Sequence, residues 1–198
     1  MKLLIKSDVV KDDTAELIIP KSKKSFDFRI DEIIFSDFVE YISDFACYNM
    51  QYLKKVEFPA NLKAIGKNSF AYCTALKYLS IPTSKIPIRA FYKCTDLDNV
   101  FFSQKLTSIE QEAFAFCDSL TKIILPQSLN SLGKQAFTHC KNLEEVNINA
   151  KYLSYYDPNA FSYCPKLKRI NLWGRVSNTN VPFIRKYKNK INFCYKYA

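Results

Sequence analysis

Apolar positions along the chain recur in an eight-residue phrase of the form Ala-Phe-x-x-Cys-x-x-Leu. Successive copies begin 23, 21, 23, 23 and 24 residues apart. A fixed period of this size predicts a solenoid, in which each repeat forms one coil. The copies are ACYNMQYL (46–53, degenerate), SFAYCTAL (69–76), AFYKCTDL (90–97), AFAFCDSL (113–120), AFTHCKNL (136–143) and AFSYCPKL (160–167).

Each phrase runs into a second pattern, Leu-x-x-Val-x-Phe, whose last residues alternate as in a β-strand. A proline often follows, where the missing N–H helps to end the strand. A Leu-x-x-Ile element then leads back to the next phrase. We therefore expect each coil to contain a strand, an apolar turn and a short helical turn. The seven strand patterns begin at Ile30, Leu53, Leu76, Leu97, Leu120, Leu143 and Leu167, and prolines follow at Pro59, Pro82 and Pro126.

Stacking of the coils would place like residues above like residues, about 4.8 Å apart along the sheet. The phrase phenylalanines would then form a buried aromatic ladder, with the phrase cysteines in a column beside it as small apolar residues. The chain contains three glycines, so we also expect few turns that need a positive φ. The predicted organisation is an N-terminal cap (1–29), a solenoid of seven strands (30–173) and a basic C-terminal cap (174–198).

The extended phrase Ala-Phe-x-x-Cys-x-x-Leu-x-x-Ile-x-Ile-Pro resembles the BspA-like leucine-rich repeat family over roughly three quarters of the chain. The resemblance implies an α/β solenoid, a right-handed superhelix with a parallel β-sheet on its concave side and short helical turns on its convex side. It also implies binding rather than catalysis. Family members include bacterial surface antigens and large protein sets of parasitic protists, often connected with adhesion.

The net charge of +10 is concentrated at the C-terminus, because no acidic residue follows Asp157. A solvated basic cap explains this charge, and Ile191, Phe193 and Tyr195 would supply apolar cover for the last coil. The alternative is an acidic partner, whether nucleic acid, anionic lipid or acidic protein. The basic residues of this segment are Lys166, Lys168, Arg169, Arg175, Arg185, Lys186, Lys188, Lys190 and Lys196.

His139 and Cys140 raise the possibility of a metal site or a Cys–His nucleophile. However, Cys140 belongs to the repeated cysteine column, and the position of His139 is Tyr, Lys or Phe in other copies. The cysteines are separated by repeat lengths, not by zinc-ligand spacings, and their number, seven, is odd. We therefore expect reduced, buried thiols, no metal, no cofactor and no enzymatic activity.

A partner-binding surface is expected on the concave face, where strand residues that do not face the core point outward. Tyr78, Phe101 and Ile124 fall at such positions on consecutive strands and would form one exposed apolar patch. Lys55 and Lys122 would border this patch. Trp173 would close the face at its C-terminal side.

The first residues lack the long apolar run of a signal peptide, and no window resembles a membrane-spanning helix. From this we expect a cytoplasmic protein-interaction module, with a monomer preferred. The alternative is a cell-surface or released adhesin, exported by an unconventional route, that binds host protein or glycan. Nucleic-acid binding through the basic C-terminal region ranks third.

Overall fold

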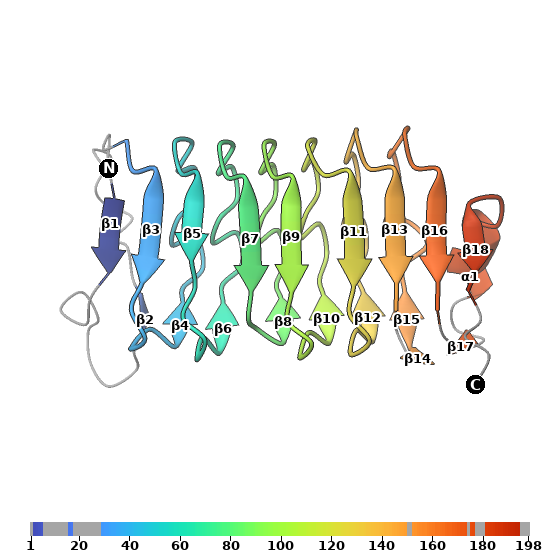
Figure 1. The fold of residues 1–198 in the computed structure, drawn as a ribbon, viewed down its shortest axis with the longest axis horizontal. Coiled ribbons are helices and arrows are strands. Elements are labelled where there is room, and N and C mark those ends of the chain that lie inside the picture. The colour runs from blue at the N-terminus through green and yellow to red at the C-terminus, as the bar shows by residue number, and fades with distance from the viewer. Residues whose placement is uncertain are drawn as a thin grey trace.

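The computed structural model describes residues 2–5, 16–17, 29–149, 152–173, 175–176 and 181–194. They form a parallel β-solenoid of about seven turns with very little helix, whose coils lie side by side along one axis (Figure 1). All strand pairs in the described residues are parallel, as expected for coils that repeat in one direction.

One long strand from each coil forms what we call the long-strand sheet. The seven predicted strands are all present, and two more lie in the segments predicted as caps, β1 before them and β18 after them. The strands are β1 (Lys2–Ile5), β3 (Glu32–Phe35), β5 (Lys55–Glu57), β7 (Tyr78–Ile81), β9 (Asn99–Phe102), β11 (Lys122–Leu125), β13 (Glu145–Ile148), β16 (Arg169–Leu172) and β18 (Ile191–Phe193).

A second row of two-residue strands forms the short-strand sheet; β6, β10 and β12, for example, are the last two residues of Leu-x-x-Ile/Leu elements. It is divided into the groups β2-β4-β6 and β8-β10-β12-β15, with the pair β14-β17 beside them. These strands are β2 (Glu16–Leu17), β4 (Tyr41–Ile42), β6 (Ala64–Ile65), β8 (Lys85–Ile86), β10 (Ser108–Ile109), β12 (Ser131–Leu132), β14 (Tyr152–Leu153), β15 (Tyr155–Tyr156) and β17 (Arg175–Val176).

The prolines that follow some strands cannot donate an N–H to the preceding coil, and pairing with the preceding strand is reduced at these strands. Where no proline follows, the next residue donates its N–H to the preceding coil, as Ser103 does to the carbonyl of Ile81. Pro59 follows β5, which pairs with β3 at three positions, and Pro82 follows β7, which pairs with β5 at one position. Ahead of Pro126, no pairing joins β9 to β11 among the described residues.

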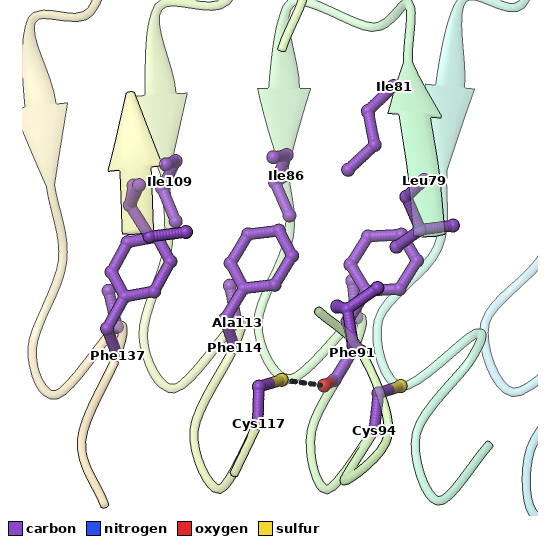
Figure 2. Packing of buried hydrophobic residues seen from close by; sticks show 14 of the residues in the cluster. Leu79, Ile81, Ile86, Phe91, Cys94, Ile109, Ala113, Phe114, Cys117 and Phe137 are labelled. Carbon is purple, nitrogen blue, oxygen red and sulfur yellow. Dashed lines mark hydrogen bonds between the residues drawn. The ribbon is translucent and has the colours of Figure 1, made fainter. Parts of the chain in front are cut away.

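The predicted aromatic ladder is confirmed, and it forms the centre of the core (Figure 2). Neighbouring rings of the column lie nearly parallel, with centroids 5.1–5.5 Å apart and interplanar angles of 5–18°. Offset stacking at this distance adds to the stabilisation from burial. The column consists of Phe70, Phe91, Phe114, Phe137 and Phe161, all buried.

The cysteine column is also buried, and its thiols act as hydrogen-bond donors as well as apolar groups. Each Sγ from Cys73 to Cys164 donates to a main-chain carbonyl of the preceding coil, as Cys117 does to Phe91 at 3.3 Å (Figure 2). Burial raises the pKa of the Cys73 thiol to about 12, which keeps its proton in place for donation. All seven cysteines are free thiols.

The prediction of short helical turns on the convex side is wrong, and so is the expectation of few positive φ angles. In the described residues, eleven non-glycine residues have φ between 54° and 64°. They occupy two columns, one before Ser/Ala-Phe and one before Cys. They are Phe45, Asn49, Asn68, Tyr72, Arg89, Lys93, Glu112, Phe116, Gln135, His139 and Tyr163.

The left-handed conformation turns backbone N–H groups along the solenoid axis, so that they bond to the next coil. Tyr72, Lys93 and Phe116 each donate to a carbonyl of the following coil at 2.7–2.9 Å. A helical turn would instead direct these N–H groups back into its own coil. For nine of the eleven residues, all except Gln135 and Tyr163, an inter-coil hydrogen bond offsets the strain of about 1–2 kcal/mol. Only α1 (Val181–Lys186) is an α-helix in the described residues.

The helix α1 and the turn after it cover the last phenylalanine of the ladder. Phe183 and Tyr187 are buried, and both rings pack against Phe161, at centroid distances of 6.2 and 6.1 Å. The Tyr187 hydroxyl also accepts the Phe161 N–H at 3.2 Å. The prediction that Phe193 caps the core is wrong, since its side chain is 43% exposed. Ile191 is partly buried against the core, and Tyr195 lies outside the described residues.

We predict that Ser69→Ala stabilises the protein by about 1 kcal/mol. Ser69 is fully buried and its hydroxyl has no hydrogen-bond partner. The equivalent position is alanine in the next four coils, for example Ala113. Urea denaturation would show the gain. The reciprocal variant, Ala113→Ser, should lower stability, and a destabilised Ser69→Ala would mean that this hydroxyl is satisfied.

Candidate protein-binding surface

The concave face is defined here as the solvent-facing side of the long-strand sheet. Along β7, Leu79 and Ile81 are buried whereas Tyr78 and Ser80 are exposed, and β11 follows the same alternation. The strand pairing places Tyr78 beside Lys55 and Asn99, and Phe101 beside Ser80. The outward positions expected from the sequence therefore lie on one surface.

Three apolar side chains form the centre of this face, which we call the concave patch. Tyr78 is 41% exposed, Phe101 64% and Ile124 54%. They come from the consecutive coils of β7, β9 and β11, and the interruption of the sheet lies between Phe101 and Ile124. Large apolar groups exposed at neighbouring positions are typical of binding surfaces.

Lys55, predicted to border the patch, is held by two carboxylates of the same face. Its Nζ lies 2.8 Å from Glu32 Oε1 and also contacts the Glu57 carboxylate. Hydrogen bonds to Glu32 and then to Glu57 raise the pKa of the Lys55 ammonium above its ordinary value. This lysine is therefore already neutralised by its neighbours.

Lys122 and Arg169 are paired in the same way, with Glu145 between them. Each cation has a nitrogen 3.0 Å from a Glu145 carboxylate oxygen. Hydrogen bonds from Lys122 and then from Asn147 hold the pKa of the Glu145 carboxyl below its ordinary value. With Lys55 and its two carboxylates included, three cations face three anions on the described concave face. The concave patch thus lies between two self-compensating ion-pair clusters.

The second outward column ends in an asparagine ladder that the sequence analysis did not recognise. The Asn171 amide donates to Asn147 Oδ1 at 2.8 Å, and the Asn192 amide donates to Asn171 Oδ1 at 3.2 Å. The sequence signal was present, since Asn147 and Asn171 are successive members of one column. Asn147 is buried, so the neutral hydrogen-bonding groups that this part of the face presents are those of the half-buried Asn171 and the exposed Asn192.

Trp173 lies just beyond the end of β16, at the position that proline holds in other coils. Its N–H donates to the carbonyl of Ile148 at 2.9 Å, and its side chain is half-buried. One strand, β13, lies between its own strand β16 and β11, which carries the last residue of the concave patch.

The His139 side chain lies on the convex surface, where it packs against neighbouring rings. Its ring lies between the rings of Phe116 and Tyr163, with both centroid distances 4.5 Å, and its Nδ1 is 3.1 Å from Thr138 Oγ1. In the part of the chain that the structure describes, no three His, Cys, Asp or Glu side chains are grouped to hold a metal ion.

The sequence matches the family model described as BspA type leucine-rich repeat region over residues 22–107 and 84–193, which together span most of the chain. The chain belongs to the BspA-type leucine-rich repeat family. The family is one of binding repeats. This confirms the resemblance on which the concave face was predicted.

Two solved structures of other leucine-rich repeat proteins share the fold. The T. pallidum leucine-rich repeat protein TpLRR matches with a TM-score of 0.66 and 23% identity, covering 85% of this chain and 88% of its own. A protein from Bacteroides ovatus gives a TM-score of 0.54 and 21% identity, covering 82% of this chain and 52% of its own. The pneumococcal vaccine antigen PcpA gives 0.45 and 16%, covering 82% and 66%. No curated protein matches the sequence.

Within the described residues of this leucine-rich repeat chain, no helix has the length and apolar character needed to cross a membrane.

Proposed function

We propose that the chain is a non-enzymatic binding module that holds a partner protein against its concave face. The observation that carries this proposal is the concave patch, three exposed apolar side chains on consecutive coils between paired charges. Such a surface binds through apolar burial at its centre and neutral hydrogen bonds at its border. The asparagine ladder supplies such a border.

The self-compensating charges also indicate the character of the partner's contact surface. Because three cations and three anions of the described part of the face are paired with one another, these residues offer no net charge to a partner. A largely uncharged partner surface fits this arrangement best. Binding should therefore change little between low and moderate salt concentration.

For the place of action, the cell-surface or released adhesin is favoured over the cytoplasmic module that the sequence analysis ranked first. The family match supports this choice, because the resemblance implies bacterial surface antigens among family members. Antibody staining of intact cells against permeabilised cells tests it. Staining of intact cells is expected, and staining only after permeabilisation would return the cytoplasmic module to first place.

We predict that Phe101→Lys combined with Ile124→Lys weakens partner binding by at least about 100-fold. The partner would be captured with the full chain from surface and cytosolic fractions, purified, and its affinity measured by calorimetry. Both side chains are exposed, so the fold should persist and the melting temperature should change little. The reason for the loss is burial of two unpaired ammonium groups at the centre of the contact.

The matched control is Phe38→Lys combined with Val181→Lys, which adds the same charge at exposed apolar residues outside the concave patch. This variant should bind the partner as the unmodified chain does. Equal affinities for both double variants and the unmodified chain would contradict the proposal, as would a strong decrease of affinity with salt.

A further inference from the structure

Some residues at the C-terminal end of the solenoid contact the last coils and cap the core, whereas others are exposed and have no role in capping. Phe183 and Tyr187 cover the ladder, as described above. Lys190 donates from Nζ to the carbonyl of Leu167 at 2.6 Å, which satisfies an acceptor at the end of the last coils. Lys186 likewise bonds to Asn159 and Ser162. These groups complete the fold.

Arg185 and Lys188 do not contribute to the cap. Both side chains are exposed, and neither has an ion-pair or hydrogen-bond partner among the described residues. Exposed apolar side chains accompany them: Val181 and Phe193 are each 43% exposed. Val181 and Arg185 are four residues apart on α1, so they share one side of the helix.

The charge of this end is not compensated, in contrast to that of the concave face. No acidic residue follows Asp157. Lys168 and Arg169 pair with Glu144 and Glu145 of the preceding coil. The other cations of this end whose side chains the structure describes have no carboxylate partner; they are Lys166, Arg185, Lys186, Lys188 and Lys190.

We propose that this end of the solenoid, residues 181–194 with Lys166, binds the surface of an anionic phospholipid membrane. Clustered lysine and arginine side chains attract anionic headgroups, and adjacent apolar side chains enter the headgroup boundary. Arg185 and Lys188 provide the charge that the fold does not use. Val181 and Phe193 provide the apolar contacts.

The environment of the aromatic residues favours lipid over single-stranded nucleic acid. Nucleic-acid binding of this kind relies on aromatic faces on which bases stack. At this end the rings of Phe183 and Tyr187 are buried against Phe161 and cannot receive a base. Phe193 is then the one exposed ring of residues 181–194, and a single ring offers no platform for successive bases. An acidic protein surface would use the cations, but it would leave the exposed Val181 without an apolar environment.

We expect the full chain to sediment with vesicles that contain phosphatidylglycerol in phosphatidylcholine, and not with vesicles of phosphatidylcholine alone. Arg185→Gln combined with Lys188→Gln should lower the partition coefficient about 30-fold, about 5-fold for each cation removed. The matched control is Lys77→Gln combined with Lys105→Gln. It removes the same charge from exposed lysines of other coils and should leave the partition unchanged.

Three outcomes would overturn the proposal. The first is equal binding of the chain to both kinds of vesicle, and the second is an equal loss of vesicle binding for the two double variants. The third is binding of the chain to polyuridylate RNA or to polyglutamate without any binding to anionic vesicles. The concave-patch variant Phe101→Lys with Ile124→Lys should retain vesicle binding, since its substitutions lie away from the C-terminal end. This separates the failure of this inference from the failure of the proposed function.

Discussion

Phe114→Ala is expected to lower the free energy of unfolding by about 3–5 kcal/mol. Its ring is fully buried and stacks on Phe91 and Phe137 at 5.3 and 5.1 Å, and it also meets the edge of Phe102 at 5.8 Å. Deletion of the ring leaves a cavity in the middle of the ladder. Because the coils on both sides are fixed by backbone hydrogen bonds, the cavity cannot close fully. Urea denaturation followed by circular dichroism would measure the loss.

Phe116→Ala is the control for this prediction. Phe116 belongs to the same turn, but its ring lies on the convex surface, stacked on His139 at 4.5 Å. Its removal should cost about 1–2 kcal/mol, less than the buried ring, because Phe116 is partly exposed and loses its contacts with His139 and Tyr92. Similar losses for the two variants would show that the buried ladder is not the main source of core stability.

Gly66→Ala is expected to destabilise the protein by about 3 kcal/mol, at the upper end of ordinary overpacking effects. A Cβ at Gly66 would lie 2.3 Å from the backbone N of Asp44 and from the carbonyl carbon of Ser43. Both atoms belong to the backbone of the preceding coil, so no side-chain rotation can relieve the contact. The coils would have to separate, which would weaken the bond from the Phe45 N–H to the Lys67 carbonyl. A shift in melting temperature would report the effect.

Gly133→Ala should be milder, because its Cβ would lie 2.8 Å from the nearest backbone atoms, N of Gln111 and C of Glu110. The same position holds Pro87 and Glu110 in other coils, so glycine is required here by the distance between coils and not by the turn itself. A Gly66→Ala variant more stable than Gly133→Ala would refute this explanation.

The strands and the interior columns could be predicted because the repeat period fixes both. Once the phrase is aligned, each phenylalanine must stack on the next, as Phe91 and Phe114 do. Alternation along a strand then assigns outward positions such as Phe101 and Ile124. The pairing of charges was also accessible, because Lys122, Glu145 and Arg169 are consecutive members of one outward column.

The conformation of the convex turns could not be predicted from residue type. Positive φ is usually indicated by glycine or asparagine, whereas here Tyr72, Phe116 and His139 adopt it. Their conformation is imposed by hydrogen bonds to the next coil and by stacking of their rings, as Phe116 stacks on His139. Both are tertiary interactions that a local pattern does not show. The strands β1 and β18 were missed for a related reason, since neither segment carries the phrase.

The hydrogen bonds between turns connect the coils along the convex side, including the places where the two sheets are interrupted. The short-strand sheet is interrupted between β6 and β8, and the long-strand sheet between β9 and β11. At both places the turns remain joined, for example by Phe70 to Ala90 and by Phe114 to Ala136. The solenoid should therefore bend about an axis that runs along the convex turns, and the bend should separate β9 from β11. Phe101 lies on β9 and Ile124 on β11, so a change of curvature would change the distance between these two side chains of the binding surface.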